Sequence, residues 1–270
     1  MNIGSSPGSI SALVTAGWDP TANDPLQTYT HGRCKALLPI AGRPMIAYVI
    51  DALTNSQAIN HILIVGLDPQ ASITFKSTVE HLPGKGDMLS NIEAGLMHIL
   101  HTRPETHAVL ISSSDIPLIT ASMIDAFIHT CQSTDHDLYY SIIERTVMEA
   151  RFPQSQRSYI HFKEGNFAAG DIAFFRTNTS VQHRDLLTRL THARKSIIKQ
   201  ALLLGPRVLI NLLLGRLTLT AAEQSIYTHL NIRTRAVPSP YPEVGMDVDT
   251  PYQLQIVQGA LSNRPNQSGK

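Results

Sequence analysis

Acidic side chains stand at two places where the chain reaches one edge of the expected sheet. Asp115 follows the apolar run 107–114, and Asp247 and Asp249 lie near the C-terminus in the segment 245-GMDVDTPYQL-254. Ligands of an open parallel sheet bind at the carboxyl ends of its strands, so these carboxylates are expected to converge there. Two aspartates suffice for Mg²⁺ when water and the phosphates of a nucleoside triphosphate complete its shell. The positions therefore indicate a site for Mg²⁺ and a polyphosphate.

A positive charge for the phosphates is available at Lys35. This lysine ends a long loop that starts after Ala16 and Gly17, and it precedes the strand-like apolar run 36–40. A lysine side chain carries a mobile point charge that suits phosphate oxygens. Lys35 is therefore the candidate cation of the site.

Each acidic position also has a purely structural explanation. Asp115 precedes Ile-Pro, where a turn-forming residue is common, and Asp249 precedes Thr250-Pro251, where a helix N-cap is expected. The spacing of the residues alone leaves both explanations open.

The elements that must position these side chains follow an α/β pattern. Short β-branched runs alternate with longer helical patterns, which indicates βαβ units around a mostly parallel sheet. Helices are expected over 44–55, near 87–100 and after a Thr120 N-cap. The expected strands are 10–16, 61–67, 107–114, 138–143, 158–162, 171–175 and 232–237.

One domain accounts for almost the whole chain. We expect it to span residues 1–262, with a helical insertion at about 183–230 and a disordered tail at 263–270. A final helix is expected to begin near Pro251. The insertion contains the run 208–222, for which a core helix is favoured over an interfacial one.

Composition excludes several classes of protein. A hydrophobic content of 43% excludes intrinsic disorder, and a formal net charge of +1 gives no reason to expect a nucleic-acid partner. Cys34 and Cys131 have no partner spacing for a zinc site or a disulfide framework, and a reducing cytoplasm fits best. The sequence also lacks a run long enough for a membrane span.

At four segments the sequence becomes recognisable. It has a strand ending in 16-AG-17, the segment 35-KALLPIAGRPMIAYVIDAL-53, the segment 112-SSSDIPLIT-120 and, near the end, 245-GMDVDTP-251. In this order, the segments resemble the MobA-like NTP transferases, which are nucleotidyltransferases of the GT-A-like fold. The resemblance covers nearly the whole chain and implies a three-layer α/β/α, Rossmann-like architecture.

The resemblance implies roles for the charged residues. Lys35 would stabilise charge on the triphosphate, and Asp115 would bind the catalytic magnesium. Asp249 would be the second metal ligand, with Asp247 as the competitor because it lies two residues away on the same side of an extended segment. The reaction implied is attack by an acceptor phosphate on the α-phosphorus of an NTP, with release of pyrophosphate.

The resemblance also implies contacts for less polar positions. Ala16 and Gly17 would approach the nucleotide with their backbone, and Asn91 would lie near its base or ribose. Gly170 and Asp171 would face the acceptor, a phosphorylated sugar or cofactor precursor.

The sequence departs from the family in the first loop. Relatives have a glycine-rich stretch and an arginine before the lysine, whereas the loop 17–35 has only Gly17 and Gly32 and contains Pro20 and Pro25. Arg33 would replace the missing arginine, although a solvent-facing arginine explains it nearly as well. This departure motivates an alternative function, a catalytically inactive regulatory domain that binds a nucleotide or sugar nucleotide. In a third hypothesis, the insertion serves membrane-surface binding or homo-oligomerisation.

Overall fold

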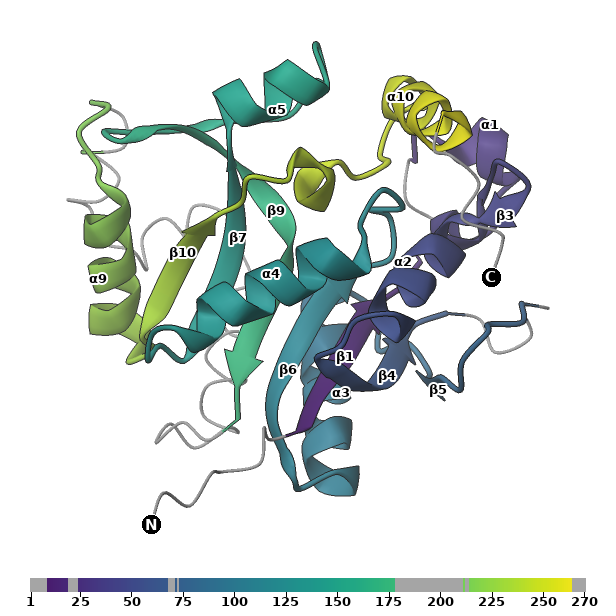
Figure 1. Cartoon of the computed structure of the whole chain (residues 1–270), viewed down its shortest axis with the longest axis horizontal. Coiled ribbons are helices and arrows are strands. Elements are labelled where there is room, and N and C mark those ends of the chain that lie inside the picture. The colour runs from purple at the N-terminus through teal and green to yellow at the C-terminus, as the bar shows by residue number, and fades with distance from the viewer. Residues whose placement is uncertain are drawn as a thin grey trace.

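In the computed structural model, the structure describes residues 9–18, 24–67, 71, 73–177, 211 and 214–263. Within these residues, a mixed sheet of eight strands runs through the molecule (Figure 1) in the order β10-β7-β9-β6-β1-β4-β5, and β8 pairs with β9. The strands are β1 (Ser9–Thr15), β4 (Ile59–Val65), β5 (Glu80–Leu82), β6 (Thr106–Ser113), β7 (Leu138–Glu144), β8 (Ile160–Phe162), β9 (Gly165–Arg176) and β10 (Thr234–Pro238).

Most strand pairs are parallel, and β9 supplies the exceptions. Strand β1 pairs in parallel with β4 and β6, β4 pairs in parallel with β5, and β10 in parallel with β7. The long strand β9 runs antiparallel to both β6 and β7, and β8 runs antiparallel to β9. The expectation of a mostly parallel α/β sheet is confirmed, and the antiparallel placement of β9 is the added feature.

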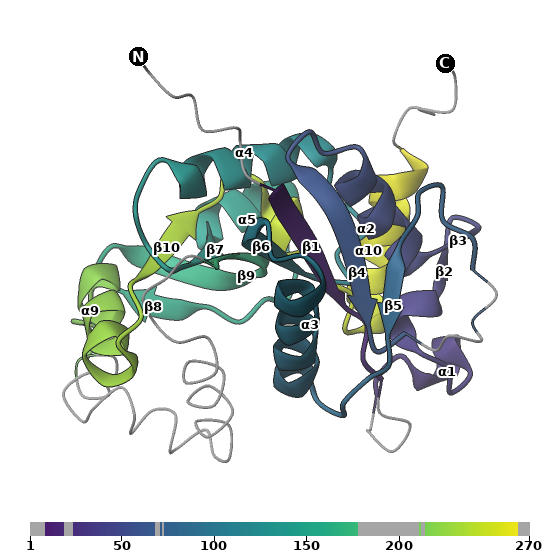
Figure 2. The ribbon, with the colours of Figure 1, turned by 90° about the horizontal axis from the view of Figure 1, so that it is seen from below.

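Helices cover both faces of the sheet, which gives the three layers (Figure 2). On one face lie α2 (Met45–Thr54) and α4 (Ala121–Gln132), and on the other lies α3 (Met88–Thr102). α9 (Leu219–Leu230) packs beside β10. The shorter helices are α1 (Gln27–Thr30) and α5 (Arg145–Arg151), and α10 (Pro251–Ser262) closes the described chain.

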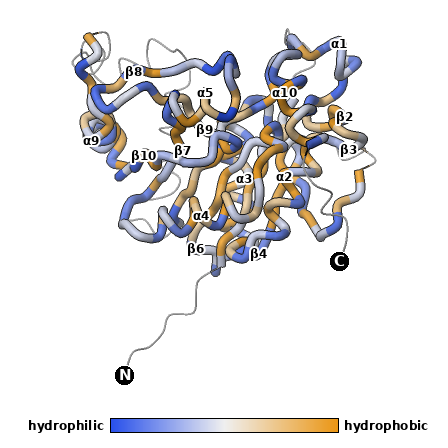
Figure 3. The backbone as a smooth tube through the Cα atoms, turned by 45° about the horizontal axis from the view of Figure 1, so that its top comes forward, coloured by the Kyte–Doolittle hydropathy of each residue, from blue (hydrophilic) through white to orange (hydrophobic). Residues whose placement is uncertain are grey.

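Alternation along the central strand explains why two helical layers form. In β1, Ala12 and Val14 pack into the core beneath α2 and α4, whereas Leu13 points to the opposite face and packs with Leu96 of α3. Successive side chains of a strand point to opposite faces, so a strand apolar on both faces must be covered twice. Apolar segments accordingly concentrate on the strands and the adjoining helices (Figure 3).

Local structure departs from expectation at the segment after Lys35. Residues 36–40 were expected to be strand-like, but a short 3₁₀ helix, η1 (Lys35–Leu37), comes first and only β2 (Pro39–Ile40) is extended. β2 forms a two-stranded sheet with β3 (Arg43–Pro44). A second 3₁₀ helix, η2 (Pro242–Gly245), precedes α10.

Part of the expected helical insertion lies outside the described residues. Residues 178–210, 212 and 213 are not described, and α9 is the described helix of that range. The expected tail likewise falls outside the described residues from position 264 onward. Among the helices that are described, none is long and apolar enough to span a membrane.

Candidate functional site

The end of strand β6 and the segment before α10 are joined by a backbone hydrogen bond. The Val248 N–H donates to the carbonyl oxygen of Asp115 at 3.0 Å. Asp115 follows β6 by two residues, and Val248 lies between Asp247 and Asp249 in the sequence. The expected convergence of carboxylates at the end of a sheet strand is therefore present, although the residues are more than 130 positions apart in the chain.

The ammonium group of Lys35 lies between two of these carboxylates. Lys35 Nζ is 2.7 Å from Asp115 Oδ2 and 2.5 Å from Asp249 Oδ1. Lys35 begins η1, whose residue Ala36 is buried, and Leu38 directly after η1 is buried too. These apolar anchors fix the backbone next to the lysine, so its side chain emerges at the acidic edge.

Charge pairing sets the protonation of this group. Burial alone would lower the pKa of Lys35, but Asp115 and Asp249 outweigh burial and raise that pKa above its ordinary value. Burial would raise the pKa of Asp249, but Lys35 outweighs it and lowers that pKa. Lys35 is therefore a permanent cation and Asp249 a permanent anion at neutral pH.

The start of α10 fixes the backbone that carries Asp249. Thr250 is the N-cap of α10, and Gln253 completes a capping box with it. The Gln253 side-chain oxygen also accepts from the Asp249 N–H at 3.0 Å. Thr250 therefore serves as the cap, which leaves the Asp249 carboxylate, with 57% of its side chain exposed, for another partner.

Asp247 has a different surrounding from Asp249. Its carboxylate forms an ion pair and hydrogen bond with Arg157 Nη1, and Gln253 Nε2 lies 3.5 Å from the same oxygen, Oδ1. Burial raises the pKa of Asp247 to about 6, although Arg157 acts in the opposite direction. Of the two competing ligand candidates, Asp247 is thus the buried one and pairs with Arg157, whereas Asp249 is more exposed and pairs with Lys35.

Gly170 and Asp171, the residues expected to face the acceptor, lie on β9. Asp171 Oδ2 is 3.8 Å from Arg157 Nη2, and burial, together with the charges of Asp247 and Asp115, raises the Asp171 pKa well above its ordinary value. A Cβ on Gly170 would lie 2.1 Å from the hydroxyl of Ser141 on β7, so strand packing by itself requires a glycine there. Their contact with an acceptor stays a prediction.

Asn91, in the first turn of α3, lies against the backbone that follows β1. Its side chain is only 1% exposed, and its oxygen accepts from the Lys85 N–H at 2.7 Å. The side-chain nitrogen of Asn91 is buried with no hydrogen-bond partner in the described part of the chain. A Cβ on Gly17 would come within 2.4 Å of this nitrogen, so Gly17 and Asn91 share one tight space. The prediction that both lie at a nucleotide site is consistent with this contact, but their contact with nucleotide is untested.

Two other sequence candidates lie near the same loop. Ala16 is buried, donates its N–H to Val65 and continues the line of β1. Arg33 is exposed beyond α1, and its side chain has no ion-pair partner among the residues that the structure describes. The geometry therefore brings Lys35, but not the Arg33 guanidinium, into the acidic group.

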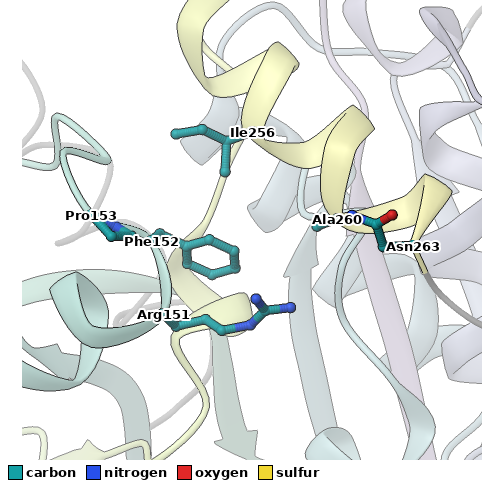
Figure 4. A pocket seen from close by; sticks show the side chains of 6 residues that line it. All are labelled: Arg151, Phe152, Pro153, Ile256, Ala260 and Asn263. Atoms are coloured by element: carbon teal, nitrogen blue, oxygen red, sulfur yellow. The ribbon is translucent and has the colours of Figure 1, made fainter.

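Two pockets of the surface lie apart from this acidic group. One pocket of about 220 Å³ lies between the end of α5 and α10 (Figure 4) and is lined by Arg151, Phe152, Pro153, Ile256, Ala260 and Asn263. A second, of about 370 Å³, is lined by residues of α9 and the start of β10, with His136. Neither lining includes a member of the Lys35 group. Because the group combines opposite charges with a backbone held by Gln253, as the site of a polar ligand requires, we take it as the functional site.

The acidic group fits a hard divalent cation. Asp115 and Asp249 present oxygens on either side of a bound positive charge, the Lys35 ammonium, which shows that a cation is stabilised between them. Among the described residues there is no group of three or more His, Cys, Asp or Glu side chains arranged to hold a metal. A pair of carboxylates is nevertheless a typical protein contribution to a Mg²⁺ shell completed by water and phosphate.

The fold and site together define the class of the protein. A solved structure described as a hypothetical transferase from Thermus thermophilus is similar over 91% of this chain and 99% of its own, with a TM-score of 0.76 and 32% sequence identity. CMP:2-keto-3-deoxy-manno-octonic acid synthetase, complexed with CTP, matches 94% of this chain and 98% of its own at a TM-score of 0.60 and 16% identity. 4-Diphosphocytidyl-2C-methyl-D-erythritol synthase from Anaerococcus prevotii DSM 20548 matches 95% of this chain and 97% of its own, at a TM-score of 0.58 and 11% identity. The fold is that of the nucleotide-diphospho-sugar transferases, as expected.

The sequence places the chain in a particular family of this class. The model of the MobA-like NTP transferase domain matches residues 30–195, and the chain belongs to that family. The match includes Lys35, Asn91 and Asp115, and it ends before Asp247 and Asp249. It confirms the resemblance found in the sequence.

A curated relative matches a smaller part. Over 97 residues the chain is 37% identical to the Bifunctional protein GlmU of Sinorhizobium fredii (strain NBRC 101917 / NGR234). The match covers 34% of this chain and 21% of that protein, so the chain matches about a fifth of the length of its curated relative.

Two residues of the site were not found from the sequence. Arg157 lies 90 positions before its partner Asp247, and no local motif marks it. Gln253 has a signal in the sequence, because Thr250 followed by a glutamine three positions later is a capping-box pattern.

Proposed function

We propose that the chain is a Mg²⁺-dependent nucleotidyltransferase that transfers an NMP group from an NTP to a phosphorylated sugar or cofactor precursor. An acceptor phosphate oxygen forms a bond to the α-phosphorus, and the bond from the α-phosphorus to the bridging oxygen breaks, so that pyrophosphate leaves. The observation that carries the proposal is the contact of Lys35 with both Asp115 and Asp249. It unites a phosphate-binding cation with two ligands for a hard metal.

In this reaction the protein mainly positions the two substrates and stabilises negative charge. Lys35 binds triphosphate oxygens and offsets charge that develops on the leaving pyrophosphate. The backbone at Ala16 and Gly17 approaches the nucleotide, and the buried amide of Asn91 binds its base or ribose. Asp171 on β9 meets the acceptor. A phosphate nucleophile is already an anion, so the reaction needs no protein nucleophile.

The cation would be held by Asp115 and Asp249. When bound, Mg²⁺ would withdraw charge from the triphosphate and complement Lys35. The role of the chain is to hold the two carboxylates at one place through the Val248 backbone hydrogen bond and the Gln253 contacts.

A thermal-shift experiment with the four NTPs, each with and without Mg²⁺, tests the proposal. A ligand at a hundred times its Kd stabilises a protein by about 2.7 kcal/mol, which is readily measured. We expect at least one NTP to raise the midpoint with Mg²⁺, and the rise to be lost in Asp115→Asn. Pyrophosphate release is then assayed with a panel of phosphorylated sugars and cofactor precursors. If no NTP stabilises the protein in the presence of Mg²⁺, the proposed function is wrong.

The same experiment distinguishes the alternative function. The first loop has two glycines and two prolines within residues 17–35, which offers few N–H donors to a triphosphate. A regulatory domain that binds a nucleotide or sugar nucleotide would be stabilised equally without Mg²⁺. It would also release no pyrophosphate with any acceptor.

A further inference from the structure

Arg157 connects three segments at the acidic edge. It lies in the loop between α5 and β8, and only 12% of its side chain is exposed. Nη1 contacts the carboxylate of Asp247, and Nη2 donates to the carbonyl oxygen of Ala169 on β9 at 3.1 Å. Nη2 also lies 3.8 Å from the Asp171 carboxylate. One guanidinium therefore ties its own loop to β9 and to the segment before α10.

The loop that presents Arg157 is held in an unusual conformation. Gln154 and Gln156 have φ angles of 61° and 57°, in the left-handed region that non-glycine residues rarely adopt. Phe152 and Ser155 of the same loop are buried. A costly backbone conformation persists only where the surrounding structure determines it. The loop is therefore built to present the arginine in a fixed direction.

The pairing with Arg157 gives Asp247 different partners from those of Asp249. Asp247 Oδ1 already has two donors, Arg157 and Gln253, in a buried position. Asp249 instead faces Lys35 with an exposed side chain. A dication at Asp247 would have to displace a buried guanidinium, whereas at Asp249 it displaces a flexible ammonium that can move to the phosphates.

We propose that Arg157 is a positioning residue that fixes the Asp249 segment relative to the acceptor strand β9, with Asp247 as its anchor and not as a ligand of the cation. The inference rests on the proposed function for the identity of the cation and of the acceptor strand. It assigns a task to an arginine outside the sequence motifs, and it decides between the two aspartates.

Binding of Mn²⁺ alone tests the assignment, because Mn²⁺ is a paramagnetic substitute for Mg²⁺ whose affinity and bound waters are measured by water-proton relaxation. The decisive variant is the neutral pair Arg157→Gln with Asp247→Asn, which removes both charges of the Arg157–Asp247 ion pair together. We expect it to keep the Mn²⁺ affinity within about threefold of the natural protein, because the two amides can still hydrogen-bond to each other. Asp249→Asn should weaken the affinity about tenfold or more, equivalent to about 1.4 kcal/mol. Arg235→Gln, which removes a half-exposed arginine of β10 paired with Glu223, is the control and should change nothing.

The single variants add a second measurement, the number of waters on the bound Mn²⁺, which would not change if Arg157 had only a structural role. In Arg157→Gln the released Asp247 can reach the cation, so the bound Mn²⁺ should carry fewer waters, and adding Asp247→Asn should restore them. Arg157→Lys keeps the charge and should keep the natural number of waters. If the neutral pair loses Mn²⁺ affinity as Asp249→Asn does, Asp247 is a ligand and the assignment is overturned.

Failure of the proposed function gives a different result. If the natural protein binds neither Mn²⁺ nor an NTP with Mg²⁺, the cation site itself is absent and the proposed function fails. A metal-free urea-unfolding cycle of the two single variants and the neutral pair then decides the remaining part. We expect strongly non-additive shifts of the unfolding midpoint, and additive shifts would refute the anchoring of Arg157 by Asp247.

Discussion

The positive charge of Lys35 partly neutralises the two carboxylates that it contacts, Asp115 and Asp249. Asp115 and Asp249 together carry one more formal negative charge than Lys35 neutralises, and a divalent cation would meet both carboxylates there. The Lys35 ammonium therefore lies next to both carboxylates that would bind the metal.

Replacing this lysine should have opposite effects on the two ligands. In Lys35→Met, the triphosphate loses a cationic partner, so we expect NTP binding in the presence of Mg²⁺ to weaken about tenfold, equivalent to about 1.4 kcal/mol. Mn²⁺ binding without nucleotide should tighten, because no ammonium competes for Asp115 and Asp249. Titration calorimetry of both ligands checks this. Lys76→Met, which removes a highly exposed lysine, is the control.

A second residue-scale prediction concerns the space shared by Gly17 and Asn91. A Cβ at Gly17 would collide with the buried Asn91 amide, so Gly17→Ala should lower the free energy of unfolding by about 1–3 kcal/mol. Adding Asn91→Ala should restore much of this loss while reducing NTP binding. Gly259→Ala in α10 is the matched control, because its Cβ would meet nothing within 4 Å and helix propensity favours alanine. An equal loss in both glycine variants would contradict the shared-space explanation, and urea unfolding measures it.

At the scale of elements, the N-terminus of α10 both starts the helix and orients Asp249, the proposed metal ligand. Gln253 accepts from the backbone N–H groups of Asp249 and Thr250, and its amide reaches toward Asp247. The cap therefore sets the direction of the segment that carries the two aspartates. A helix that began at a different residue would move Asp249 away from Lys35.

Removing two caps of the same kind separates stability from ligand geometry. Thr250→Ala and Thr120→Ala each delete an N-cap hydroxyl, from α10 and α4 respectively, and each should cost about 1 kcal/mol of stability. We expect only Thr250→Ala to weaken Mn²⁺ and NTP binding as well. Chemical unfolding and calorimetry are the two measurements. A loss of binding in Thr120→Ala of the same size would mean that general destabilisation is responsible.

The sequence predicted the elements whose signal is local. The apolar runs of β1, β4 and β6, the Thr120 cap and the start of α10 at Pro251 are each visible in short windows of sequence, and the structure has them. The short strand β5 and the β2–β3 pair were not predicted, because strands of two or three residues carry almost no periodicity. η1 takes the place of the first part of a predicted strand-like run, and its residue Ala36 is buried in the core, a tertiary contact that a short window of sequence does not show.

The candidate site likewise has residues that the sequence predicted and one that it did not. Lys35, Asp115 and Asp249 were placed together from motifs and from the rule for strand ends, and the structure brings them into contact. Arg157 was missed because its partners lie on β9 and before α10, and only the folded sheet order brings them to it. Pairing of this kind leaves no periodic or spacing signal in one sequence.

At the scale of the whole molecule, acid should destabilise the fold through a buried histidine. His61 Nε2 lies 2.9 Å from Glu80, which His98 also contacts, and its Nδ1 is buried with no partner among the described residues. Burial, followed by the charge of Arg103, lowers the pKa of His61 below its ordinary value of 6.5. The unfolded chain therefore takes up this proton first as the pH falls.

Stability from His61 is fully present above pH 6.5 and is lost as the pH falls from there through the lower pKa of the folded protein. We expect His61→Gln to be less stable at pH 7 but to lose less stability between pH 7 and pH 5 than the natural protein. His101→Gln, at an exposed position of α3, should keep the natural pH dependence. Urea unfolding at each pH measures the difference, and parallel curves for the natural protein and His61→Gln would refute the prediction.

The strand order also fixes when each part of the site can form during synthesis. Both strands that flank β1, β4 and β6, have been translated by Ser113, so Lys35 and Asp115 can meet while most of the remaining chain is still unmade. β9, which borders β6 on its other side, and Asp249 follow later, on the order of ten seconds at common translation rates. Lys35 and Asp115 are therefore synthesised well before Asp249, and the group of charged residues is complete only when the segment before α10 has been made.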